Sequence, residues 1–155
     1  MGRALLAAVV AALVVAGCGE GSGIEEGAVV TAYVEAPLCA EAEKQLARGG
    51  ARANDLTVRV SCLPRVRKGE KLDLSQIGAN ARRATEDSSS VAYVAVPDMR
   101  ATDFSLPILE EADIPRLTSA SGAAAMSRLL NAIEKADEAG SLREAVSEEL
   151  ARPGS

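Results

Sequence analysis

The three cysteines, Cys18, Cys39 and Cys62, are the residues of this sequence with the most distinctive chemistry. The chain contains no histidine, which removes the commonest general base and the commonest transition-metal ligand. A Ser-His-Asp or Cys-His catalytic arrangement therefore cannot form within this chain. The cysteines also lack the Cys-x-x-Cys spacing that is typical of zinc sites. We expect no cofactor, no metal ion and no enzymatic activity.

The residues before Cys18 have the composition of a secretion signal. Met1 to Arg3 form a short positive head, and Ala4 to Ala16 are thirteen consecutive apolar residues. A helix that crosses a bilayer needs about 20 apolar residues, so this run is too short to span one. Its length matches the apolar region of a signal peptide. A buried core helix is the alternative.

The end of this run explains the position of Cys18. The sequence Val-Ala-Gly-Cys at 15–18 resembles the bacterial lipobox. The resemblance implies that residues 1–17 are a lipoprotein signal peptide and that the Cys18 sulfur carries a diacylglyceryl group. Two acyl chains hold a protein stably on a membrane, so we expect the protein at the extracytoplasmic face. Residues 18–27 would form the lipidated cysteine and a flexible, Gly-rich tether. A disulfide involving Cys18 is the alternative.

Export would place the other two cysteines in an oxidising compartment. We predict a disulfide between Cys39 and Cys62, which would stabilise the fold by about 3 kcal/mol in the loop-entropy model. Two free, buried thiols are the alternative.

The rest of the chain alternates between strand and helix patterns. Strands are expected at 28–36, 56–63 and 91–97 and within 114–121, and helices at 37–50, 73–87, 102–113, 122–140 and 141–150. This alternation predicts one Rossmann-like α/β domain over residues 28–151. We expect a three-layer sandwich, with a four-stranded parallel sheet of order 2-1-3-4 and helices on both faces.

Helix-capping residues support these boundaries. Asp73 with Gln76 is expected to cap the helix at 73–87, and Ser141 with Glu144 the last helix. Asp103 or Ser105 would cap the helix at 102–113.

A ligand site is expected where the carboxyl ends of the first and third strands meet, because ligands of open α/β sheets bind where the strand order reverses. The segments there are 35–40 and 96–105. Beside them, 117–122 has three hydroxyl residues leading into a helix N-terminus, which can hold a carboxylate. In the alternative interpretation, these hydroxyls only cap the helix.

One segment carries a family resemblance. The sequence FSLPILEEADIPRLTSAS at 104–121 is similar to the N-terminal lobe of type I periplasmic binding proteins, the branched-chain amino acid receptor group. The tail at 129–150 also resembles the end of such chains. The resemblance implies that Ser105, Thr118 and Ser119 hold an amino-acid head group. Those receptors have two lobes, however, and this chain has room for one.

These observations define the expected function. The chain would be a lipid-anchored, solute-binding-like protein that recognises a small amino-acid-like molecule or assists ABC transport, with a permease or a partner lobe beside it. The alternative is a structural or protein-interaction lipoprotein that keeps the fold without ligand binding. Nucleic acid is excluded as a partner, because the net charge is −5 and only 2% of residues are aromatic.

Overall fold

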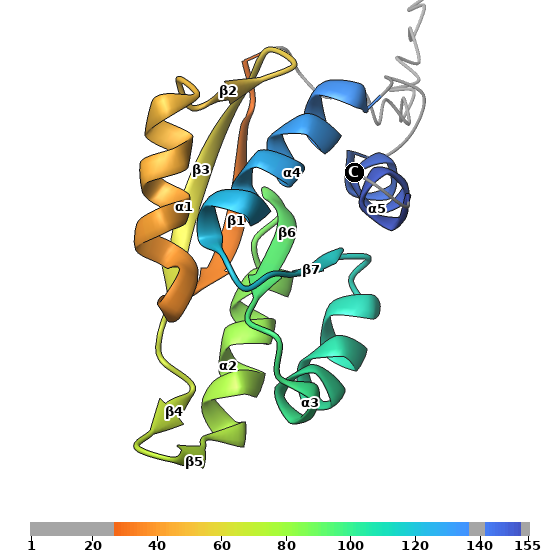
Figure 1. Cartoon of the computed structure of the whole chain (residues 1–155). Coiled ribbons are helices and arrows are strands. Elements are labelled where there is room, and N and C mark those ends of the chain that lie inside the picture. The colour runs from red at the N-terminus through yellow and green to blue at the C-terminus, as the bar shows by residue number, and fades with distance from the viewer. Residues whose placement is uncertain (1–26, 137–141, 153–155) are drawn as a thin grey trace, which may run out of the picture.

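Four parallel strands form the centre of the sheet. The computed structural model describes residues 27–136 and 142–152. In it, β1 (Val29–Glu35) lies between β3 (Leu56–Leu63) and β6 (Ser90–Ala95), and β6 pairs with β7 (Arg116–Thr118). These four strands are parallel and lie in the order β3-β1-β6-β7 (Figure 1). The α/β class predicted from the alternating pattern is confirmed.

The sheet itself is mixed, so the prediction of a four-stranded parallel sheet is wrong. A fifth strand, β2 (Arg52–Ala53), pairs antiparallel with β3 through Arg52 with Thr57 and Ala53 with Leu56. Asn54 and Asp55, with φ of 47° and 60°, form the two-residue turn between them. Tight hairpins require this left-handed backbone, which Asn and Asp tolerate better than most residues. The turn folds the chain back and extends the order to β2-β3-β1-β6-β7.

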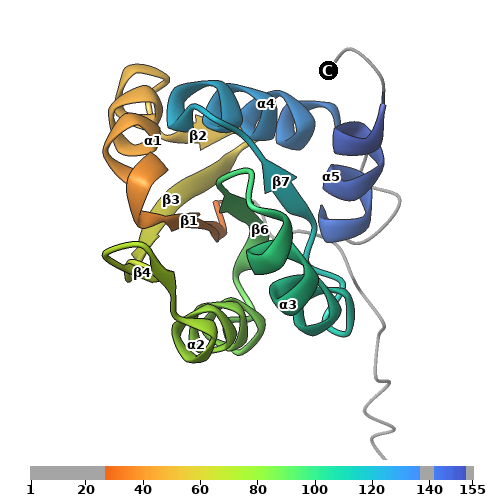
Figure 2. The same cartoon turned by 60° about the horizontal axis from the view of Figure 1, so that its bottom comes forward.

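Helices cover both faces of the sheet (Figure 2). One face packs against α1 (Ala36–Arg48) and α4 (Gly122–Lys135), with α5 (Leu142–Ala151) beside α4. The other packs against α2 (Leu74–Thr85) and α3 (Met99–Glu110). The central strands β1 and β6 are buried almost throughout, which agrees with their nearly continuous apolar sequence.

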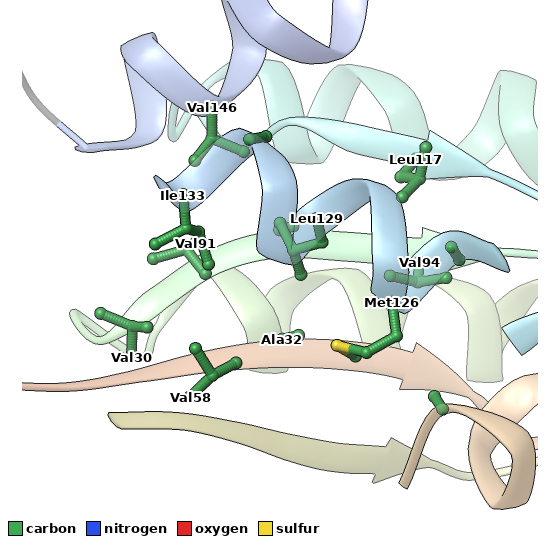
Figure 3. Packing of buried hydrophobic residues seen from close by; sticks show 14 of the residues in the cluster. Val30, Ala32, Val58, Val91, Val94, Leu117, Met126, Leu129, Ile133 and Val146 are labelled. Atoms are coloured by element: carbon green, nitrogen blue, oxygen red, sulfur yellow. The ribbon is translucent and has the colours of Figure 1, made fainter. Parts of the chain in front are cut away.

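The larger hydrophobic core lies between the sheet and α1, α4 and α5. Figure 3 shows side chains from several strands meeting those of α4 and α5; the labelled set is Val30, Ala32, Val58, Val91, Val94, Leu117, Met126, Leu129, Ile133 and Val146. A smaller core on the opposite face contains Tyr33 and Tyr93, packed near Leu109 of α3. Aliphatic residues and alanines therefore supply most of the interior of this aromatic-poor chain.

The helix starts agree only in part with the sequence predictions. Asp73 caps α2 by accepting a hydrogen bond from the Gln76 N–H at 3.1 Å, as expected. The expected cap of the next helix is wrong: α3 begins at Met99, and the Asp98 carboxylate accepts from the Ala101 N–H at 3.2 Å. Ser105 therefore lies inside α3 rather than at its start. Ser141, the expected cap of the last helix, lies outside the described residues.

The basic segment at 65–71 contains a small hairpin. Its strands are β4 (Arg67–Lys68) and β5 (Lys71–Leu72), which pair antiparallel. Gly69, at φ 63°, permits the tight turn between them. Lys68 forms an ion pair with Asp73 at 3.2 Å, so the hairpin is attached to the start of α2.

The predicted disulfide is confirmed. Cys39 in the first turn of α1 is bonded to Cys62 near the end of β3, with the two Cα atoms 5.6 Å apart. The bond links a helix to the strand it crosses over, at the carboxyl edge of the sheet.

A close backbone approach fixes the position of α4 against α1. A Cβ atom placed on Gly122 would lie 2.0 Å from the carbonyl oxygen of Leu38. A few turns along the same interface, the Gln45 side chain donates to the Ser127 hydroxyl at 3.1 Å. Glycine at 122 is therefore required by space.

We predict that Gly122→Ala lowers the free energy of unfolding by about 3 kcal/mol or more, because α4 must move away from α1 to relieve the clash. Urea unfolding followed by circular dichroism measures the loss. Gly49→Ala is the matched control, since its Cβ would meet no atom closer than 3.6 Å. Equal stability of the two variants would contradict the close packing of these helices.

Candidate functional site at the carboxyl edge of the sheet

The chain leaves β1 and β6 in opposite directions. From β1 it crosses through α1 to β3, and from β6 it crosses through α3 to β7. This reversal leaves a crevice outside the carboxyl ends of the two strands. A small cavity of about 120 Å³ lies there, lined by Pro37, Arg65, Val66, Arg67, Val96, Asp98 and Ala101.

Charges of both signs line this cavity. Arg67 forms an ion pair with Asp98, and its other terminal nitrogen donates to the Glu70 carbonyl at 3.3 Å. The pKa of Asp98 is lowered by the hydrogen bond from the Ala101 N–H and by Arg67. Asp98 is therefore ionised at neutral pH, and the cavity offers a cation and an anion side by side.

A buried carboxylate lies beneath the segment that forms one wall of the cavity. Glu35, the last residue of β1, is only 2% exposed. It accepts hydrogen bonds from the Val96 N–H at 3.0 Å and the Tyr93 hydroxyl at 3.3 Å. Burial raises the pKa of Glu35, although these bonds and the charge of Arg116 oppose the rise. Glu35 thus attaches the end of β1 to the segment that carries Val96 and Asp98.

The counter-charge for Glu35 comes from β7. Burial lowers the pKa of Arg116, while the nearby Glu35 opposes that shift. The Arg116 guanidinium donates to the Thr118 hydroxyl at 2.6 Å. Its Nε and second terminal nitrogen are buried and have no hydrogen-bond partner among the described residues. The interaction between Glu35 and Arg116 is therefore electrostatic rather than a hydrogen-bonded ion pair.

The three predicted ligand residues lie apart from this cavity. Ser105 is buried within α3 and donates to the Ala101 carbonyl at 2.8 Å. Thr118, at the end of β7, accepts from Arg116. Ser119 follows it and donates to the Ser121 carbonyl at 2.8 Å. The structure brings Thr118 and Ser119 together and leaves Ser105 in the helix; their role in ligand binding stays a prediction.

The helix N-terminus expected to hold a ligand carboxylate already holds a carboxylate of this chain. Glu41 of α1 accepts from the Ser121 hydroxyl and from the Gly122 N–H, both at 3.0 Å. Ser121 also caps α4 by accepting from the Ala124 N–H. A ligand carboxylate at this position would have to displace Glu41.

The segments expected to form the site, 35–40 and 96–105, contain part of the cavity lining. No role was predicted for Glu35, which lies beneath the cavity wall, or for Asp98, although the sequence contains a signal for each. Glu35 is a single acid within an otherwise apolar strand, which is a rare position for a charge without a partner. Asp98 stands three residues before Ala101, where an N-cap carboxylate belongs. Arg67 carried no such signal, because only the β4–β5 hairpin places it beside Asp98.

Cys39, Glu43 and Cys62 place two sulfurs and a carboxylate within 4.8 Å of one another, as in a metal site. The two sulfurs are bonded to each other, however. They therefore offer no thiolate to an ion, since metal binding by cysteine needs the deprotonated thiol.

No protein-family model, curated protein or solved structure matches this chain. Among residues 27–136 and 142–152, no helix is both long and apolar enough to span a membrane. The expected signal peptide at 1–17 and the lipidated Cys18 lie outside the described residues.

We predict that Glu35→Gln changes how stability depends on pH. The folded state keeps the Glu35 proton to higher pH than the unfolded chain, so wild type loses stability relative to the variant as pH rises from 4.5 through the raised pKa. Urea unfolding at several pH values measures the difference.

Asp98→Asn provides a control of opposite sign. The pKa of the Asp98 carboxyl is lowered in the folded state. Wild type should therefore lose stability relative to this variant as pH falls from 3.8 through the lowered pKa. A pH profile of Glu35→Gln that is parallel to wild type would contradict the burial of an ionisable Glu35.

Proposed function

We propose that this chain is a lipid-anchored, extracytoplasmic binding module that recognises a small amino-acid-like head group at the carboxyl edge of its sheet. The observation that carries the proposal is the pairing of Arg67 and Asp98 in the wall of the cavity between β1 and β6. A zwitterionic head group carries a carboxylate and an ammonium, which match these two charges. The position agrees with the general location of ligand sites in open α/β sheets.

The size of the cavity supports a shared site. About 120 Å³ is well below the roughly 300–1,000 Å³ of typical small-molecule pockets. A head group would be enclosed, and the remainder of the ligand would stay in contact with water. A partner lobe or a permease would supply the opposite wall in this proposal, as the resemblance to one lobe of a two-lobed binding protein suggests.

The alternative is a structural or protein-interaction lipoprotein that keeps the fold and binds no small molecule. The carboxylate of Glu41 on the N-terminus of α4 favours this alternative, because it occupies a place where a ligand carboxylate would otherwise bind. Arg67 and Asp98 also satisfy each other in the absence of a ligand.

Ligand binding is tested by thermal melting with a panel of free amino acids at millimolar concentration. A ligand that binds only the folded state raises the melting temperature. At a free ligand concentration of about 100 times the dissociation constant, the free energy of unfolding increases by about 2.7 kcal/mol. N-acetylated and amidated amino acids should give smaller shifts, since each lacks one of the two charges. The absence of any shift would favour the structural alternative.

Matched variants locate the site. Arg67→Gln should abolish the shift, whereas Lys68→Gln, which removes a charge from the same hairpin outside the cavity, should keep it. If Ser119→Ala abolishes the shift and Arg67→Gln does not, the ligand lies at the end of β7 instead.

The anchor is tested by growing a bacterial host that expresses the protein with labelled palmitate. Label should enter wild type and the Cys39→Ala/Cys62→Ala variant, but not Cys18→Ala, because Cys18 is the cysteine of the lipobox-like sequence. Equal labelling of Cys18→Ala and wild type would exclude this anchor.

A further inference from the structure

The strand β7 is an open edge of the sheet. It is the terminal strand, and among the described strands it pairs with β6 alone. The Pro115 carbonyl accepts from Tyr93 at 2.9 Å and the Ser119 N–H donates to Ala95 at 3.0 Å, so these residues face β6. Backbone groups alternate in direction along a strand. The N–H and C=O groups of Arg116 and Thr118 therefore point away from the sheet.

A groove of about 670 Å³ lies beside this edge. Its floor includes Ile114 and Arg116, and its walls come from α3 and α5. Figure 2 shows β7 between these two helices at the border of the sheet. Such a groove beside an unpaired strand has the form that β-strand addition uses, in which an extended segment joins the sheet.

The groove walls are acidic. Glu110 of α3, Asp113 before β7, and Glu144 and Glu148 of α5 line the groove with two arginines. The Arg143 guanidinium is held within the protein, because it donates to four backbone carbonyls, those of Asp87, Ser88, Ser90 and Ala112. With both arginines counted, four carboxylates and two guanidiniums leave the groove lining with a formal charge of −4 + 2 = −2.

Arg116, the other arginine of the groove, lies close to the buried Glu35. The net character of the groove is therefore negative. A second copy of the chain would bring the same carboxylates against these, so charge disfavours pairing between two copies.

We propose that this groove receives an extended, basic segment of a partner polypeptide, which adds to β7 as a further strand. Its backbone pairs with Arg116 and Thr118. Successive side chains of the added strand point to opposite walls of the groove. Lysines or arginines on one face of that strand would meet Glu110 on α3, and those on the other face would meet Glu148 on α5. The site is separate from the cavity between β1 and β6, and it shares no lining residue with that cavity.

The test titrates the purified protein with the peptide acetyl-KVKVK-amide and follows backbone amides by NMR. The amides of Arg116 and Thr118 should shift. The acidic peptide acetyl-EVEVE-amide and a backbone N-methylated form of the basic peptide should produce no shift, because the first lacks the charge and the second lacks the pairing groups. No shift with the basic peptide at millimolar concentration, or equal shifts with the acidic one, would overturn the proposal.

Variants separate the charge from the backbone contribution. Glu110→Gln with Glu148→Gln should weaken binding about threefold to tenfold through the loss of two exposed pairs, whereas Asp103→Asn with Glu134→Gln, outside the groove, should leave affinity unchanged. Equal affinity of these two double variants would overturn the charge argument.

Thr118→Pro removes an outward N–H and should abolish binding, whereas Thr118→Ser, which keeps that N–H and the hydroxyl that accepts from Arg116, should retain it. Circular dichroism checks that both variants fold. If Thr118→Pro does not fold, the glutamate variants still test the proposal. Analytical ultracentrifugation of wild type should show a monomer. A dimer that Thr118→Pro dissociates would overturn the proposal, since the edge would then hold a second copy.

Discussion

The carboxyl edge of this protein depends on one buried acid, Glu35. Glu35 ends the central strand, and its carboxylate accepts hydrogen bonds from the backbone of Val96 and from the hydroxyl of Tyr93. A buried carboxylate is costly unless it is paired or hydrogen-bonded. These bonds therefore hold the segment after β6 against the end of β1. The cavity between the two strands depends on this attachment for its shape.

At the same edge, the chain satisfies its own charges. Asp98 both caps α3 and pairs with Arg67, while Glu41 occupies the N-terminus of α4. In each case a helix N-terminus, with its free N–H groups and positive end of the dipole, is matched to an anion from the same chain. Any small acidic molecule must compete with these internal carboxylates, which restricts binding to a ligand or a partner that offers an equivalent charge.

The two proposed sites differ in physical character. The cavity between β1 and β6 is small and has charges of both signs, so it fits a compact head group. The groove beside β7 is larger and acidic and borders unpaired backbone, so it fits an extended chain. The two proposed sites lie on neighbouring parts of the fold but rely on different interactions, and each can fail without the other.

Much of the fold could be predicted from the amino-acid sequence. Apolar runs separated by capped helices predict an α/β chain, and Asp73 was recognisable as a cap because its effect is local. The disulfide between Cys39 and Cys62 was predicted because export would place these two cysteines in an oxidising compartment, and the structure contains this bond. The helix cap depends on a short stretch of chain, and the α/β class depends on the order of strands and helices, which can be read from the sequence pattern.

The fifth strand and the contacts at the carboxyl edge could not be predicted, because they depend on tertiary packing. The Asn54-Asp55 turn added an antiparallel strand, because a two-residue hairpin is set by backbone angles that the wider strand pattern does not reveal. The contacts of Arg67 with Asp98 and of Glu41 with α4 join residues far apart in the chain. The sequence shows which side chains could make such contacts, but only the packing of α1 against α4 and of the β4–β5 hairpin against α3 determines which charges meet.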